Sequence, residues 1–395
     1  MVDRRDLLKL MGAAGATALL PGAALALANA PTDRRLVIIL QRGAQDGLQA
    51  LVPYTDPNYR RFRPGIAIAA PGEEGGAIDL DGQFGLHPNL KTFHQLWQQG
   101  DLAAVPAVAT RYRERSHFDG QNLLENGSGT PFGASDGFLN RALQGFGDSD
   151  AKLGMAFGHT IPLALRGEAR VRSWAPSTLP EADDDFLMRL ADSYGEDPLF
   201  AEAIEEGMAP MAGMAELSNR EKRQAVRGRT LTPAAQAAGE ALSAADGPRI
   251  ALIESNGWDT HNGARNRLNQ LFNGLDAAMS TLRESMATVW DDTLVITISE
   301  FGRTVRENGS GGTDHGTGGT TFVAGGAVNG GRIHGGWPGL REQDLFEDRD
   351  LAPVTPLESV LKTALGPHLG LPMTYLNGTV LPGSDDAQPL PRLLG

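Results

Sequence analysis

The sequence predicts an α/β protein built on a doubly wound, mainly parallel β-sheet. Residues 36–40 and 293–298 are short, continuous apolar runs, which are typical of strands buried on both faces of a parallel sheet. Residues 264–290 repeat apolar side chains at three- and four-residue spacing, as a helix packed on a sheet does. An apolar run at 249–254 precedes this helix, so strand, helix and strand form a crossover unit, which is right-handed in parallel sheets.

Shorter patterns predict the remaining elements. Further strands are expected at 102–108, 163–166 and 320–324, and hairpins are expected to join 66–70 to 78–80 and to span 325–336. Helices are expected at 90–99, 138–146 and 356–365, and a helical insertion at about 183–236. All of these elements fit a single domain of residues 31–395.

Composition narrows the class of protein. The chain has 395 residues, of which 41% are hydrophobic and 21% charged, as in ordinary soluble globular proteins. Its formal net charge of −13 argues against a nucleic-acid partner, because phosphate backbones are held by clustered lysine and arginine. With no cysteine, the chain has no disulfide, no thiolate metal site and no cysteine nucleophile.

Residues 1–30 have the pattern of a cleaved twin-arginine export signal. Arg4 and Arg5 precede a moderately apolar run at 10–28, and small-x-small cleavage sites follow at 26–28 and 28–30. An uncleaved membrane anchor is the weaker interpretation, because glycines and a proline make the run a poor spanning helix. We therefore expect a periplasmic or secreted protein with no stable membrane span after cleavage.

Carboxylates and imidazoles follow two of the predicted strands. Asp259 and His261 come after the strand at 249–254, and Asp259 could alternatively cap the next helix while His261 faces solvent. Glu300 comes directly after the strand at 293–298. Ligands of open α/β sheets bind outside the carboxyl ends of the strands. Carboxylate with imidazole suits zinc, manganese or iron. We therefore expect one or two divalent metal ions, with zinc or manganese favoured.

The glycine-rich loop after Glu300 carries more groups of this kind. Asp314 and His315 lie in its middle, and Arg303 lies near its start. A carboxylate, an arginine and an Asp-His pair are groups that hold a cation and an oxyanion. The sequence therefore predicts the functional site here, with Arg303 contacting an anionic substrate.

Two earlier segments supply further candidates. Asp46 follows the first strand, where it is either a metal ligand or the cap of an Asp-Gly turn. Ser116 stands where a helix should begin, so it could be both cap and nucleophile, with His117 beside it. Arginines at 111, 113 and 115 make this loop locally basic, as a small anionic ester substrate would require.

The motifs RGAQDGL, SHFDGQNLLENG, GWDTH, SEFGRT and GTDHG occur in this order behind the export signal. Together they resemble the domain-of-unknown-function 1501 family, a branch of the alkaline phosphatase and sulfatase superfamily, over nearly all of the mature chain. The resemblance implies a doubly wound sheet, one or two divalent metals and a serine or threonine nucleophile at a helix N-terminus. It implies ligand roles for Asp46 and for a three-ligand site of Asp259, His261 and His315, and the nucleophile role for Ser116.

The chain departs from the superfamily pattern at one place. Glu300 stands where the superfamily has an Asp-His pair, and Phe301 occupies the place of the histidine. A second metal would then lose a ligand unless His117 or Asp314 supplies one. The sulfatase signature, a modifiable Cys or Ser followed by x-Pro-x-Arg, is absent, which counts against sulfate esters.

Two functions follow as hypotheses. The first is a metal-dependent hydrolase of phosphate or related esters, in which the metal activates Ser116 and Arg303 or Arg115 holds the other ester oxygens. The second is a non-catalytic exported scaffold with a degenerate metal site, acting as the partner of another exported protein. Fold alone does not decide between them.

Overall fold

The computed structural model describes residues 32–147, 152–176, 184–194 and 231–395. The predicted export signal and most of the predicted helical insertion lie outside these residues. Of the insertion, the structure describes α7 (Asp184–Tyr194) and the start of α10 (Thr232–Ser243).

The centre of the fold is one mixed sheet with the strand order β11-β5-β10-β9-β1-β8-β6-β7, and β12 pairs with β5. The strands are β1 (Arg35–Arg42), β5 (Leu102–Ala109), β6 (Gly154–Phe157), β7 (Val171–Trp174), β8 (Ile250–Asn256), β9 (Thr293–Ile298), β10 (Gly319–Ala324), β11 (Arg332–Ile333) and β12 (Thr355–Pro356). A small second sheet contains β2 (Leu51–Val52), β4 (Gly85–Leu86) and β3 (Ile78–Asp79) in that order.

Most of the large sheet is parallel. β9, β1, β8, β6 and β7 run in one direction, and β10 is antiparallel to both of its neighbours. Leu40 pairs with Ile298 and Arg42 with Asn256, so the carboxyl ends of β1, β9 and β8 meet at one edge. This register brings together the segments that follow these three strands.

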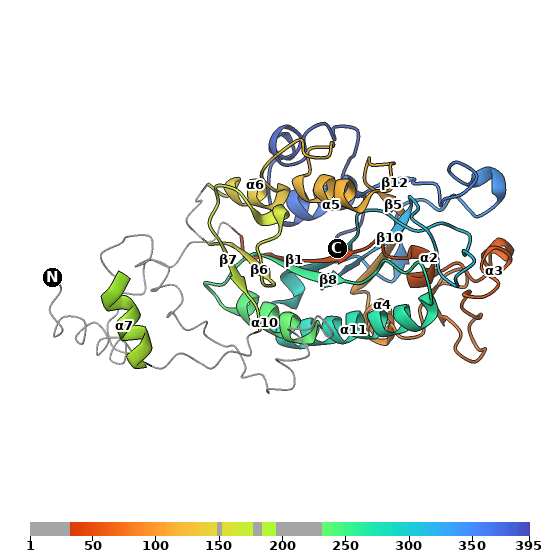
Figure 1. The fold of residues 1–395 in the computed structure, drawn as a ribbon, viewed down its shortest axis with the longest axis horizontal. Coiled ribbons are helices and arrows are strands. Elements are labelled where there is room, and N and C mark those ends of the chain that lie inside the picture. Colours follow the sequence, from red (N-terminus) through yellow and green to blue (C-terminus); the bar gives the residue numbers. More distant parts are fainter. Residues whose placement is uncertain (1–31, 148–151, 177–183, 195–230) are drawn as a thin grey trace.

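Helices cover both faces of the sheet (Figure 1). One face carries α4 (Lys91–Gln99), α10 and α11 (Ala264–Ser285), and the other carries α5 (His117–Asn126) and α6 (Phe138–Gln144). Among the described residues, the other α-helices of the domain are α2 (Gly47–Ala50), α3 (Pro57–Phe62), α12 (Leu357–Thr363) and α13 (Met373–Tyr375). The doubly wound α/β architecture expected from the sequence is therefore confirmed.

The alternation of side chains along β1 explains the two layers. Leu36, Ile38 and Leu40 belong to the core that includes α5, α6 and α12, whereas Val37 and Ile39 belong to the core that includes α4, α10 and α11. Because successive residues of a strand point to opposite faces, a strand apolar at every position must be covered on both sides.

Several predicted elements differ from the structure. The expected hairpin of 66–70 with 78–80 is wrong, because β3 pairs with β4 while the Gly65 and Ile66 N–H groups bond to the Glu307 carboxylate. The expected strand at 163–166 is wrong too, since residues Leu163–Leu165 form a 3₁₀ helix. The expected hairpin at 325–336 instead contributes β11, which runs parallel to β5. Local apolar runs do not reveal such long-range partners.

Within the described parts of the chain, no helix is both long enough and apolar enough to cross a membrane.

Candidate metal centre

Three histidines surround one carboxylate oxygen at the edge where β1, β8 and β9 end. The Nε2 atoms of His261, His315 and His117 lie 3.0, 3.3 and 3.5 Å from Asp259 Oδ1. The Nε2 atoms of His261 and His315 are 2.9 Å apart. The structure thus brings together Asp259, His261 and His315, as predicted, and adds His117.

The elements around the centre explain how these side chains meet. α5 begins at His117, directly after Ser116, whose backbone is extended (φ −93°, ψ 126°). The helix ends at Gly127, whose φ of +63° is a conformation that glycine adopts without strain. Asp259 and His261 lie between β8 and α11, and His315 lies in the loop before β10.

Each imidazole is held through its other ring nitrogen. His117 Nδ1 lies 2.7 Å from Glu300 Oε1, and His315 Nδ1 lies 2.8 Å from the Arg115 carbonyl oxygen. His261 Nδ1 lies 3.2 Å from Asp314 Oδ1. A neutral imidazole that donates from Nδ1 keeps a lone pair on Nε2. Metal-binding histidines have this arrangement, in which an oxygen behind the ring fixes its tautomer and direction.

The donor atoms fit a divalent cation. Ligands 2.0–2.1 Å from a tetrahedral ion are about 3.3 Å apart. The distances from Asp259 Oδ1 to the three Nε2 atoms and the distance between His261 and His315, 2.9 to 3.5 Å, are close to this value. His117 Nε2 is enclosed and has no hydrogen-bond partner in the described part of the chain. Ligand atoms of His117, Asp259 and His315 all lie within 4.8 Å of one another. An imidazole and carboxylate set suits zinc or manganese.

Burial and neighbouring charges shift the pKa values of Asp259, His315 and His117. Burial acts to raise the pKa of Asp259, but the charge and hydrogen bond of Arg303 outweigh it and keep that pKa low. Burial lowers the pKa of His315, so its ring is neutral and its lone pair available. The hydrogen bond to Glu300 raises the pKa of His117. Protons and metal therefore compete most strongly at His117.

Arg303 and Glu300 lie directly behind the centre. Arg303 Nη2 donates to Asp259 Oδ1 at 2.6 Å, and the arginine side chain has no exposed surface. Its Nε and Nη1 are enclosed without a hydrogen-bond partner among the residues described. The structure therefore gives Arg303 contact with a candidate ligand, Asp259. Glu300 is likewise enclosed and contacts His117, as described above.

Asp46 has a different neighbour. Both of its carboxylate oxygens lie 2.9 Å from Arg63 Nη1, and its side chain makes no capping hydrogen bond to α2. Thr313 Oγ1 approaches Asp46 Oδ2 at 3.4 Å. The structure thus links Asp46 to the glycine-rich loop through Thr313 and does not include it in the group around Asp259. Arg63 is a partner that the sequence analysis missed.

Ser116 occupies the N-cap position of α5, yet its side chain makes no capping hydrogen bond. Its backbone N–H donates to the Tyr112 hydroxyl at 3.2 Å. The predicted capping role is therefore not seen, and Asp119 instead approaches the Tyr112 hydroxyl at 3.3 Å. Ser116 directly precedes His117 and so lies beside the centre.

The arginines of the 111–115 loop are less available than the sequence suggests. Arg115 pairs with Glu347 and with Asp350, and Arg111 pairs with Asp386. Arg115 also has a left-handed backbone (φ +60°), in the segment whose carbonyl accepts from His315. Its backbone therefore supports the centre while its guanidinium is neutralised.

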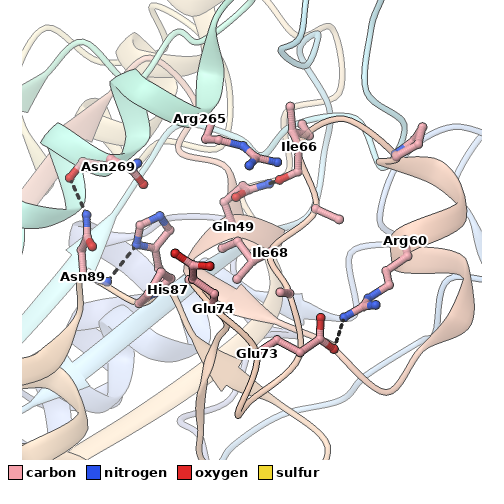
Figure 2. A pocket seen from close by; sticks show the side chains of 15 residues that line it. Gln49, Arg60, Ile66, Ile68, Glu73, Glu74, His87, Asn89, Arg265 and Asn269 are labelled. Atoms are coloured by element: carbon pink, nitrogen blue, oxygen red, sulfur yellow. Dashed lines mark hydrogen bonds and ion pairs between the residues drawn. The ribbon is translucent and has the colours of Figure 1, made fainter.

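A separate cavity of about 560 Å³ lies beside the N-terminal end of α11 (Figure 2). Gln49, His87, Asn89 and Asn269 contribute its amide and imidazole groups, and Arg265 lies at its edge. None of the residues that line it belongs to the group around Asp259. The cavity is therefore distinct from the candidate centre.

The family of this chain follows from a match over most of its length. The family described as "Protein of unknown function (DUF1501)" matches residues 33–380. The chain belongs to this family. No curated protein matches the sequence.

Solved structures with a similar fold include members of the alkaline phosphatase and sulfatase group. The phosphonate monoester hydrolase of Agrobacterium radiobacter has 13% identity and a TM-score of 0.38, with 86% of this chain and 74% of that chain covered. The alkaline phosphatase from the Antarctic bacterium TAB5 has 14% identity and a TM-score of 0.35, with 76% and 93% covered. The lipoteichoic acid synthase from Listeria monocytogenes has 11% identity and a TM-score of 0.35, with 82% and 74% covered.

Proposed function

We propose that this member of the family is an exported, metal-dependent hydrolase of phosphate or related esters. The observation that carries the proposal is the convergence of three imidazole Nε2 atoms on Asp259 Oδ1, within 3.5 Å, while an oxygen acceptor holds each Nδ1 from behind. Such preorganised lone pairs repel one another unless a cation or a proton lies among them.

The residues have distinct roles in this proposal. Asp259, His117, His261 and His315 would hold a zinc or manganese ion. A bound divalent cation lowers the pKa of a nearby hydroxyl and stabilises negative charge on an ester oxygen. Ser116 would supply that hydroxyl as the nucleophile. Its position at the N-terminus of the ten-residue α5 adds backbone N–H groups that favour an anionic substrate.

The alternative is a non-catalytic exported scaffold that binds another exported protein. The enclosure of Arg303 favours it, because an arginine that clamps a substrate must reach it. The ion pairs of Arg111 and Arg115 point the same way. The two functions differ in whether Ser116 matters for any measurable turnover.

The test compares metal-loaded protein with Ser116→Ala on chromogenic phosphomonoesters and phosphodiesters. We expect the wild-type protein to turn over at least one ester class and the variant to lose roughly 100-fold or more in kcat. Ser280→Ala is the matched control, because Ser280 lies on the exposed face of α11 and bonds to Glu284. Equal rates for Ser116→Ala and wild type would remove serine from the mechanism. No turnover, together with a stoichiometric co-purified partner, would support the scaffold.

A further inference from the structure

The Glu300 oxygen that contacts the centre through His117, Oε1, already has three donors around it. It accepts from the Gly43 backbone N–H at 2.9 Å and from Gln121 Nε2 at 3.0 Å, and it lies 2.7 Å from His117 Nδ1. The Glu300 Oε2 lies 2.9 Å from the Ser299 hydroxyl, whose single proton is shared with the Gln41 carbonyl oxygen at 2.6 Å. A carboxylate oxygen has about two lone-pair sites, so three donors leave Oε1 none for a cation.

The direction of the Gln121 amide is fixed from its other end. Arg42 Nη1 donates to Gln121 Oε1 at 3.0 Å, so the amide nitrogen must face Glu300. Arg42 is in turn held by Glu125 at 2.7 Å and by Glu254 at 2.6 Å. The Gln121 donor to Glu300 is therefore oriented by Arg42 and its two glutamate partners.

His117 is the only member of the described donor set that touches this carboxylate. Because Glu300 is an acceptor, His117 donates from Nδ1, and its Nε2 lone pair faces Asp259. The Phe301 ring stacks on the imidazole at a centroid distance of 5.0 Å and an angle of 25°, which fixes the plane of the ring. Phe301, which stands where the resemblance to the superfamily implies a histidine, thus packs against His117.

We infer that Glu300 is a positioning residue, which holds His117 as a ligand of a single divalent ion and does not bind the ion itself. This inference rests on the proposed metal centre and deepens it. It replaces the expectation that Glu300 belongs to a second metal site. Oxygen acceptors behind metal-binding histidines typically contribute 10- to 100-fold to metal affinity.

The experiment measures zinc stoichiometry and affinity for the metal-free wild-type protein and Glu300→Gln, by elemental analysis and by competition with a chromophoric chelator. We expect one equivalent in both proteins and an affinity about 10- to 100-fold weaker in the variant. Glu358→Gln is the matched control, because Glu358 is a buried glutamate on α12 outside the donor set, and it should bind zinc like wild type.

The other possible outcomes of the zinc-binding experiment contradict either the role of Glu300, the metal centre or the hydrolase proposal. Two equivalents in wild type and one in Glu300→Gln would make Glu300 a ligand. One equivalent with equal affinity in both proteins would deny Glu300 any role at His117. No zinc bound by wild type would overturn the metal centre and this inference together. One equivalent with the expected weakening, but no ester turnover by wild type, would support the inference and overturn only the hydrolase.

Gln121→Leu provides a second variant in case Glu300→Gln does not fold. It removes a donor to Glu300 and leaves every donor around Asp259 in place. We expect one equivalent of zinc with an affinity weakened about tenfold. An affinity equal to that of wild type would contradict the chain of contacts from Arg42 to His117.

Discussion

The histidines of this protein differ in what their ring nitrogens meet. His117, His261 and His315 each have an oxygen acceptor at Nδ1 and converge through Nε2. His87 and His368 are instead buried outside the centre: His87 packs on Phe272 at 4.5 Å, and His368 Nε2 meets the Arg35 carbonyl oxygen at 2.9 Å. Burial lowers the pKa of each to about 4, and hydrogen bonds with Asn269 at His87 and with the Arg35 backbone at His368 oppose it only in part. Both are therefore structural histidines that stay neutral at pH 7.

The lowered pKa values of His87 and His368 predict that the folded protein loses stability in acid. The unfolded chain binds protons at His87 and His368 below about pH 6.5, whereas the folded protein does so only near pH 4. Their contribution to stability is thus fully present above pH 6.5 and is lost as the pH falls toward 4. We expect each to remove about 2 kcal/mol of unfolding free energy between pH 7 and pH 5.

Urea unfolding of metal-free wild type, His87→Gln and His368→Gln at both pH values measures this contribution. Each variant should lose less stability than wild type on going from pH 7 to pH 5, whatever its stability at pH 7. His94→Gln is the control, since His94 lies on α4, shortly after His87 in the chain, and is only partly buried. A pH dependence unchanged in both variants would refute the assignment.

At the scale of elements, the predictable parts are those whose pattern is continuous. β1, β9 and α11 follow from apolar runs and from helical periodicity, and the structure has them within a few residues of the predicted bounds. The segment 66–70 does not form a strand, because the Ile66 N–H bonds to Glu307, which is 241 positions away, and the Ile68 N–H bonds to the Tyr59 hydroxyl. Such a partner leaves no trace in a local pattern.

The glycine-rich loop before β10 needs a glycine at position 312 to approach the segment after β8. A Cβ on Gly312 would lie 2.4 Å from the His261 carbonyl group, and the Thr313 N–H donates to the Thr260 carbonyl oxygen at 3.2 Å. Close approach of the loop to the segment after β8 is what brings His315 to His261. Glycine is required at 312 for space, because the nearby atoms belong to the backbone and cannot rotate away.

Gly312→Ala should therefore separate the two histidines. We expect zinc affinity to fall at least about tenfold, because ligand geometry must be held within a fraction of an ångström. Gly309→Ala is the control in the same loop, since no atom lies within 4 Å of a Cβ there. Titration with zinc against a chromophoric chelator measures both, and equal affinities in the two variants would contradict the packing argument.

At the scale of the whole molecule, the candidate centre depends on contacts between segments far apart in the sequence. His117 meets Glu300 across 183 positions, and His261 meets His315 across 54. The sequence predicts which strand ends carry chemical groups, because parallel strands end at one edge. It does not predict that Asp46 pairs with Arg63, or that Glu300 faces His117, since several acceptors of similar chemistry compete at that edge.

Because its side chains come from distant segments, the candidate centre forms only in folded protein, and this is relevant to the proposed export route. The proposed ligands come from three distant segments and converge only in a folded chain, so an ion would bind to folded protein and stabilise it to a degree set by its affinity. The twin-arginine route carries folded proteins, which would allow the centre to be loaded before export. Replacing Arg4 and Arg5 by lysine should leave the precursor in the cytoplasm.

Cell fractionation with immunoblotting measures this outcome, and residues 31–395 alone provide a cytoplasmic control. Wild type should appear outside the cytoplasm at the size of the cleaved chain, and the double variant should retain the precursor size. The zinc content of the two forms is then compared. The retained precursor should bind as much zinc as the exported form, because both contain the same folded domain. Export of the double variant at the wild-type level would remove the twin-arginine proposal while leaving the metal centre untouched.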